Sequence, residues 1–141
     1  MIWNRLLRRK PAPAVALLRG APAVRREKSY SATTGYVYQY YYEGYREGGR
    51  GGQPGNEHVF HVSSDRKTSF ALTVFLSRAV VEGWESRHGR TLSPTEQYAA
   101  VKLTLFQTFD DRDELGAATA DVEVDAAGME AHLETLGIAE P

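Results

Sequence analysis

The stretch TSFALTVFL, residues 68–76, decides how this chain folds. It is rich in aromatic, β-branched and aliphatic residues, which favour a β-strand. Successive side chains of a strand point to opposite faces of the sheet. One row of this strand is wholly apolar and the other is mixed: Phe70, Leu72, Val74 and Leu76 against Ala71, Thr73 and Phe75. We therefore expect the apolar row to face the core and the mixed row to face away from it.

Two further strands are predicted before this one. Residues 36–43 alternate as a strand does, with tyrosine at every even position, and residues 57–63 repeat the pattern with Phe60 and Val62 on the apolar row. We expect the tyrosine row to pack beneath the helices: Tyr36, Tyr38, Tyr40 and Tyr42. The glycine-rich residues between these strands are predicted to break regular structure, because they are too many for a tight hairpin turn. The order of the strands indicates an antiparallel meander.

Helices are predicted to follow. Ser77 can cap a helix that Gly89 would end, and SPTE at residues 93–96 is a capping box with proline at the first helical position. The second of these helices should run to about Asp111 and form the centre of the core. A short strand at residues 120–124 and a last helix are expected after it, with three apolar residues on one side of that helix: Met129, Leu133 and Leu136.

The fold class that we predict is α+β. A three-stranded or four-stranded antiparallel sheet is packed on one face by two to three helices. Residues 1–29 form a disordered, basic, Pro/Ala-rich N-terminal arm, and residues 30–141 form a single domain with an acidic C-terminal part. The charge pattern supports this division: residues 1–28 hold eight basic residues and one acidic residue, whereas residues 110–141 hold ten acidic residues and one basic residue.

The compartment is less constrained. The 141 residues contain no cysteine, and their apolar runs are far too short to cross a bilayer. We expect a cytoplasmic protein. The alternative is targeting to an organelle through the arginine-rich N-terminal segment, which could also anchor the chain at a membrane surface or to a partner.

The leading functional hypothesis is a small non-catalytic interaction module that binds through the uncovered sheet face. The partner would be another protein or a second copy of the chain, because aromatic residues are enriched at the centres of interfaces. The expected contact residues are Tyr41, His61, Thr73 and Phe75.

The alternative is the binding of single-stranded nucleic acid. Aromatic side chains on an open sheet can stack bases, and arginines can contact phosphates. The phosphate contacts would come from the glycine-rich segment and the arm: Arg46, Arg50, Arg8 and Arg9.

Catalysis and metal binding have no strong signature. His58 and His61 are three positions apart, so on a strand they point to opposite faces and cannot share one ion. An enzyme would need His61 or His88 beside a carboxylate such as Glu57 or Asp65, and no nucleophile elbow, phosphate-binding loop or zinc-protease motif is present. We expect no cofactor, no metal and no catalytic residue.

Overall fold

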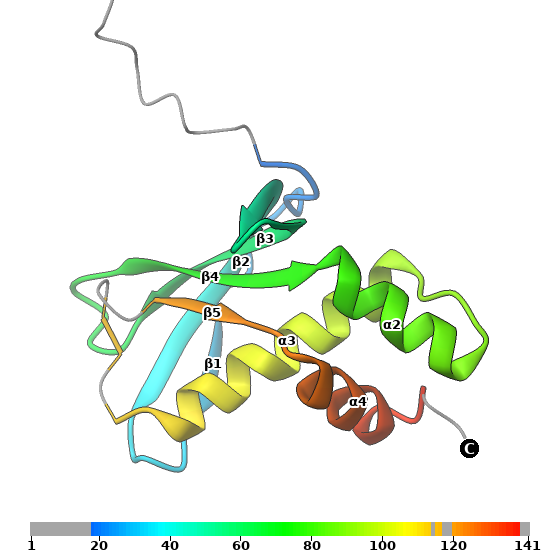
Figure 1. Ribbon diagram of the computed structural model, residues 1–141. Helices are drawn as coiled ribbons and strands as arrows, with labels where there is room; N and C mark the ends of the chain where they lie inside the picture. The colour runs from blue at the N-terminus through cyan, green and yellow to red at the C-terminus, as the bar shows by residue number, and fades with distance from the viewer. Residues whose placement is uncertain (1–17, 114, 117–119, 139–141) are drawn as a thin grey trace, which may run out of the picture.

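A computed structural model describes residues 18–113, 115–116 and 120–138 of the chain. Its elements, in chain order, are β1 (Lys28–Ser31), β2 (Val37–Arg50), β3 (Gln53–Ser63), β4 (Phe70–Ser77), α2 (Arg78–His88), α3 (Pro94–Asp111), β5 (Asp121–Glu123) and α4 (Ala126–Thr135). All three helices lie on one side of a curved sheet (Figure 1). No helix in the described part of the chain is both long and apolar enough to span a membrane.

The predicted α+β class is confirmed, but the predicted sheet is too small. The sheet has five strands in the order β1-β2-β3-β4-β5. The first four strands are antiparallel, and β5 pairs in parallel with β4, so the sheet is mixed. The parallel pair arises because two helices, α2 and α3, carry the chain from the end of β4 back to the start of β5.

The sequence led us to expect that the glycine-rich segment would break regular structure. This prediction is wrong, because the segment is part of the sheet. Strands β2 and β3 continue through it as one long hairpin, which turns at Gly51 and Gly52 with φ values of 57° and 82°. Two central residues with positive φ are what a two-residue hairpin turn requires. The glycines inside the strands permit close approach, since a Cβ atom at Gly55 would collide with the carbonyl oxygen of Leu76.

Both predicted helix starts are confirmed. The Ser77 side chain accepts a hydrogen bond from the Val80 amide, and Gly89 ends α2 in the left-handed conformation. Ser93 and Glu96 form the reciprocal capping box of α3, and the helix ends at Asp111 as predicted. These signals are local, so the sequence alone was enough to find them.

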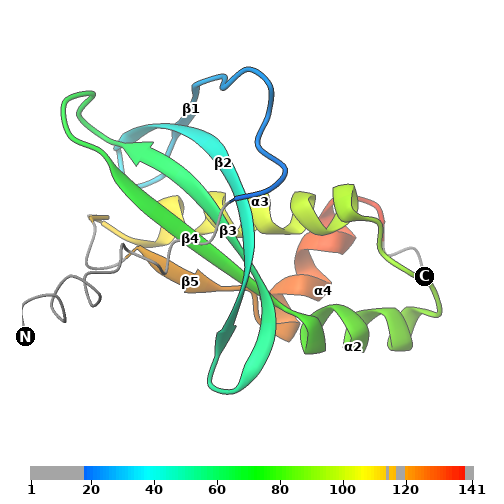
Figure 2. The same cartoon turned by 90° about the horizontal axis from the view of Figure 1, so that it is seen from above.

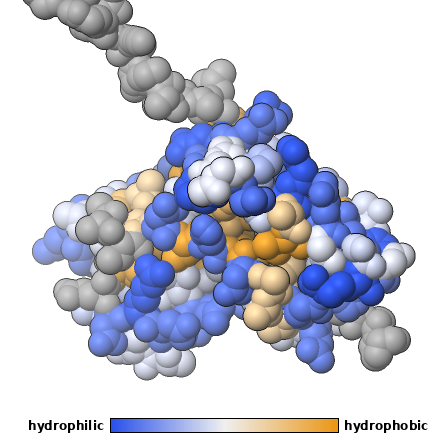
Figure 3. Space-filling model, viewed as in Figure 1, coloured by the Kyte–Doolittle hydropathy of each residue, from blue (hydrophilic) through white to orange (hydrophobic). Residues whose placement is uncertain are grey.

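The core lies between the sheet and the helices, on the face that the sequence predicted. Leu72, Val74, Phe60 and Val62 are fully buried there. In the view of Figure 3, apolar side chains gather in the middle of the molecule, over the region where β4 and β5 meet the helices. Beneath α3, the Tyr38 ring stacks on Phe109 with 4.3 Å between ring centroids.

Two predicted core residues lie elsewhere. Tyr36 precedes β2 and is exposed, so the buried part of the tyrosine row begins at Tyr38. Leu136 follows the last turn of α4 and is 40% exposed, whereas Met129 and Leu133 are buried as expected. Both exceptions are at the ends of elements, where the periodic pattern no longer fixes the direction of a side chain.

Part of the segment that we had assigned to the N-terminal arm lies against the sheet. Lys28–Ser31 forms the edge strand β1, and Tyr30 of this strand stacks on Phe106 of α3 with 4.5 Å between ring centroids. Ahead of it, Arg19 pairs with Tyr45 through two backbone hydrogen bonds. Figure 2 shows the connecting residues as a blue loop between these two points of attachment.

Candidate functional site

A pocket of about 590 Å³ opens between the sheet, α3 and the loop that precedes β1. This volume is within the range of about 300–1,000 Å³ that is usual for small-molecule sites. The loop lines it with Gly20, Pro22, Val24, Arg26 and Lys28, the sheet with Tyr40, Tyr41, Tyr42, Tyr45, Asn56 and His58, and α3 with Pro94, Thr95, Gln97, Tyr98 and Lys102.

The pocket exists because β1 is shorter than its partner strand. β1 pairs with β2 only from Val37 to Tyr40. Further along β2, the backbone pairs with the edge again where Arg19 bridges to Tyr45, and between these points the Arg25 side chain forms an ion pair with Glu43 at 3.1 Å. Residues 20–27 therefore arch away from the sheet between these two points, and the space under the arch is one side of the pocket.

A β-bulge sets the aromatic lining of the pocket. The register of β2 against β3 shifts between Tyr42 and Gly44. Residues 42 and 45 would point to opposite faces of a regular strand, but the extra residue brings both side chains to the face that carries His58. The ring centroids of Tyr42 and Tyr45 are 6.0 Å and 5.7 Å from that of His58.

His58 is the buried polar group of the pocket wall. Only 7% of the residue is exposed, and burial lowers the pKa of its imidazole from 6.5 to about 4. Its Nδ1 atom is hydrogen-bonded to the Tyr42 hydroxyl at 2.9 Å. Burial also raises the pKa of Tyr42 above its ordinary value of 10. Both groups are therefore neutral at pH 7 and place no charge on this wall of the pocket.

Helix α3 supplies the opposite wall. Thr95, Tyr98 and Lys102 are three and four positions apart, so they lie on one face of the helix. The ring of Tyr98 is 4.7 Å from that of Tyr42, centroid to centroid. Burial, with a smaller contribution from Tyr40, raises the pKa of Tyr98 to about 12.

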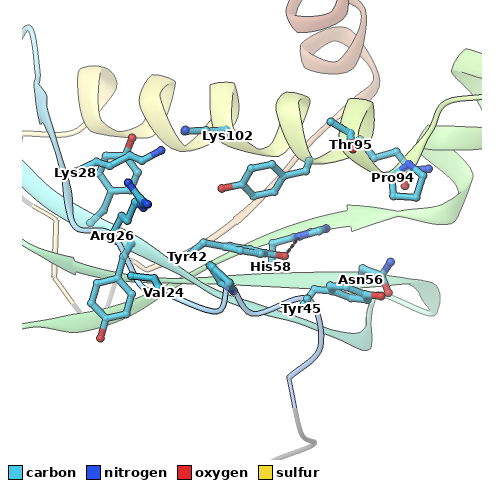
Figure 4. A pocket seen from close by; sticks show the side chains of 16 residues that line it. Val24, Arg26, Lys28, Tyr42, Tyr45, Asn56, His58, Pro94, Thr95 and Lys102 are labelled. Carbon is cyan, nitrogen blue, oxygen red and sulfur yellow. Dashed lines mark hydrogen bonds between the residues drawn. The ribbon is translucent and has the colours of Figure 1, made fainter.

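One end of the pocket is cationic. Arg26, Lys28 and Lys102 lie together there, and Asn56, Pro94 and Thr95 lie at the other end (Figure 4). Within the described residues, none of these three cations takes part in an ion pair. Burial, followed by the nearby Lys28 ammonium, lowers the pKa of Lys102. An anion placed here would relieve this repulsion between like charges.

The four predicted partner-binding residues lie on the sheet face opposite the helices, and Tyr41 also borders the pocket. Tyr41 and His61 are neighbours across β2 and β3, and their rings stack with 4.6 Å between centroids. Both are partly exposed, as is Thr73. Phe75 is only 2% exposed, and the Arg50 guanidinium lies 4.9 Å from its ring centroid. The partly exposed surface on this face therefore centres on Tyr41 and His61, and the Arg25 guanidinium lies 5.5 Å from the Tyr41 ring centroid.

Arg46 and Arg50, two of the four predicted phosphate contacts, are paired with carboxylates. Arg46 and Arg50 each donate to Glu57 at 2.7 Å, and Arg50 also donates to Asp121 at 2.9 Å. Burial opposes ionisation of Glu57, but the hydrogen bonds from Arg46 and Arg50 outweigh it and keep the pKa of the carboxyl below its ordinary value. This network ties the hairpin to β5. Arg8 and Arg9, the other two predicted contacts, lie outside the described residues.

The pocket was not predicted from the sequence. Tyr42 was expected in the core, Tyr45 in the glycine-rich break between strands and Tyr98 on the apolar stripe of the core helix, and Lys102 was given no role. The one available signal was the glycine at position 44, because a glycine directly after a run of strand residues is typical of a bulge. No group of three or more histidine, aspartate or glutamate residues in the described part of the chain is placed to hold a metal ion.

Comparison with protein-family models, with curated protein sequences and with solved structures finds no match to this chain.

Proposed function

We propose that this protein is a non-catalytic binding module for small organic anions, which it holds in the pocket between β2, α3 and residues 20–28. The observation that carries the proposal is the cationic end of the pocket. Arg26, Lys28 and Lys102 converge there without an ion-pair partner in the described part of the chain, directly beside an aromatic cavity.

The lining supports a ligand with two chemically different ends. Tyr42, Tyr98 and His58 offer ring faces and edges to a flat apolar body, and aromatic pairs gain from such packing. A negatively charged head group would sit among the cations and accept charge-assisted hydrogen bonds from them. A neutral or cationic ligand of the same shape would leave the positive charges unpaired.

The arrangement supports binding without turnover. The hydrogen bond of His58 is to a tyrosine hydroxyl, and the structure shows no carboxylate bonded to its ring in the described residues. Burial holds the imidazole in its neutral form. General acid–base work at neutral pH favours a group whose pKa is near the operating pH, and this histidine is far from that value.

The first prediction concerns charge selectivity. Phenylacetate should bind more tightly than its neutral analogue phenylacetamide, by about tenfold, which corresponds to about 1.4 kcal/mol. Lys28→Met should remove most of this preference because it deletes one of the converging cations. Titration calorimetry measures both quantities, and Lys67→Met, at an exposed turn position, is the matched control. Equal affinity for the acid and the amide would refute the proposal.

A second candidate function is self-association through the sheet face opposite the helices. The stacked Tyr41 and His61 rings are partly exposed there, and Val37 on the same face is 43% exposed. A second copy of the chain is favoured over nucleic acid as the occupant, because Arg46 and Arg50 are already paired with carboxylates. The acidic C-terminal part of one copy would also complement the basic N-terminal part of another.

The second prediction tests this surface. His61→Ala should raise the dissociation constant of the dimer by about tenfold, since an aromatic anchor at the centre of an interface contributes more than about 1 kcal/mol. Sedimentation velocity over a range of concentrations measures the effect. His61 is preferable to Tyr41 because Tyr41 also borders the pocket. A protein that stays monomeric throughout would eliminate this candidate, and a salt-sensitive shift of a single-stranded oligonucleotide would favour nucleic acid in its place.

A further inference from the structure

Two amines face each other at the cationic end of the pocket. Lys28 and Lys102 both line this end of the pocket, where their side chains lie near each other (Figure 4), and the Lys102 amine lies 5.9 Å from the ring centroid of Phe106. Lys102 is partly buried on α3, whereas Lys28 is exposed on the edge strand. Among the residues that line the pocket, the charged groups at this end beside the Lys102 amine are the Lys28 ammonium and the Arg26 guanidinium, and the ring of Phe106 lies next to it.

This environment is the one that makes a lysine nucleophilic. A lysine amine attacks carbonyl carbon only in its neutral form, and an apolar surrounding or a neighbouring cation favours that form. Lys102 has both, and its pKa is lowered accordingly. A carboxylate beside the amine would have the opposite effect, and the described residues place none in an ion pair with it.

We propose that Lys102 forms a reversible imine with the ketone of aromatic 2-oxo carboxylic acids that enter the pocket. This inference rests on the proposed function and specifies its ligand class. In a 2-oxo acid the carboxylate and the ketone are on adjacent carbon atoms. Lys28 and Arg26 would hold the carboxylate while the Lys102 amine reaches the neighbouring carbonyl carbon, and the aromatic ring would extend towards Tyr42 and Tyr98.

The step is balanced without an external reagent. The lone pair of the neutral Lys102 amine adds to the carbonyl carbon, and the carbonyl π electrons move to oxygen. A proton passes from nitrogen to that oxygen to give a carbinolamine. Loss of the hydroxyl group as water, with a second proton, leaves a carbon–nitrogen double bond. The products are one imine and one water, and no group is oxidised or reduced.

The experiment traps the imine on the full-length protein. The protein is incubated with phenylpyruvate, sodium borohydride is added to reduce any imine to a secondary amine, and the adduct is weighed and located by mass spectrometry of the intact chain and its peptides. We expect one adduct per chain, at Lys102. Lys102→Arg keeps the positive charge but has no amine that forms an imine, so the adduct should be lost. Lys67→Arg removes an exposed lysine and should leave the adduct unchanged.

Binding of phenylacetate, which has no ketone, separates this inference from the proposed function. Phenylacetate should bind and should suppress the adduct in proportion to its occupancy. If phenylacetate binds but phenylpyruvate gives no adduct, or labels Lys67 as readily as Lys102, the imine inference is wrong and the proposed function stands. If phenylacetate does not bind and does not suppress labelling, both are wrong.

Discussion

We expect the free energy of unfolding to fall by about 3 kcal/mol because of His58 alone, as the pH drops from the ordinary pKa of this histidine to its pKa in the folded protein. Burial lowers the pKa of His58 from 6.5 to about 4. Between these values the unfolded chain takes up a proton on this ring and the folded chain does not. The contribution is therefore fully present above pH 6.5 and is lost as the pH falls to about 4.

Urea unfolding at a series of pH values, followed by circular dichroism, measures this dependence. His58→Phe keeps an aromatic ring of similar size and has nothing to protonate. Over this pH range its free energy of unfolding should therefore fall by about 3 kcal/mol less than that of the wild type. The matched control is His61→Asn on the same strand, where the side chain is on the opposite face and partly exposed. Equal slopes for the wild type and His58→Phe would contradict a lowered pKa of His58 as the source of this pH dependence.

Gly44→Ala is expected to destabilise the fold by about 3 kcal/mol and to weaken ligand binding. Gly44 has a φ of 128°, in a region that residues with a Cβ atom rarely adopt. A Cβ atom there would also lie 2.6 Å from the Arg19 carbonyl oxygen. The contact would push Arg19 off the edge of β2, and the loop that closes the pocket would lose its attachment.

Gly35→Ala is the control that separates strain from contact. Gly35 also has a positive φ, 101°, but a Cβ atom at that position would meet nothing within 4 Å. It should cost about 1 kcal/mol of unfolding free energy and leave phenylacetate affinity unchanged. Thermal unfolding and titration calorimetry on the two variants provide the comparison. The proposed role of Arg19 in closing the pocket would be contradicted if both variants retained wild-type affinity.

The helices and the buried face of the sheet could be predicted because their signals are local. Ser77, Ser93 and Gly89 act on amides and carbonyls within a few residues of themselves. The apolar row from Leu72 to Leu76 identifies the inward face by alternation alone. The glycine-rich hairpin was harder, because the same glycines suit a loop or a close-packed strand, and only the neighbouring strand decides between them.

The pocket depended on information that neighbouring residues do not carry. The bulge after Tyr42 is a mismatch between two strands, so it is defined only once β3 is paired with β2. The position of β5 at the edge of the sheet is likewise defined only by its parallel pairing with β4, which the sequence of β5 does not indicate. Lys28 and Lys102 are far apart along the chain and meet only because α3 crosses over the short edge strand.

The sequence by itself thus determined the class of fold, the helix boundaries and the face on which the core forms, since each follows from periodicity or from a hydrogen bond between near neighbours. The tertiary structure alone decided the sheet order, the arch of residues 20–27 and the gathering of three cations beside an aromatic cavity. These depend on where distant segments come to rest, and that is set by the packing of the whole chain.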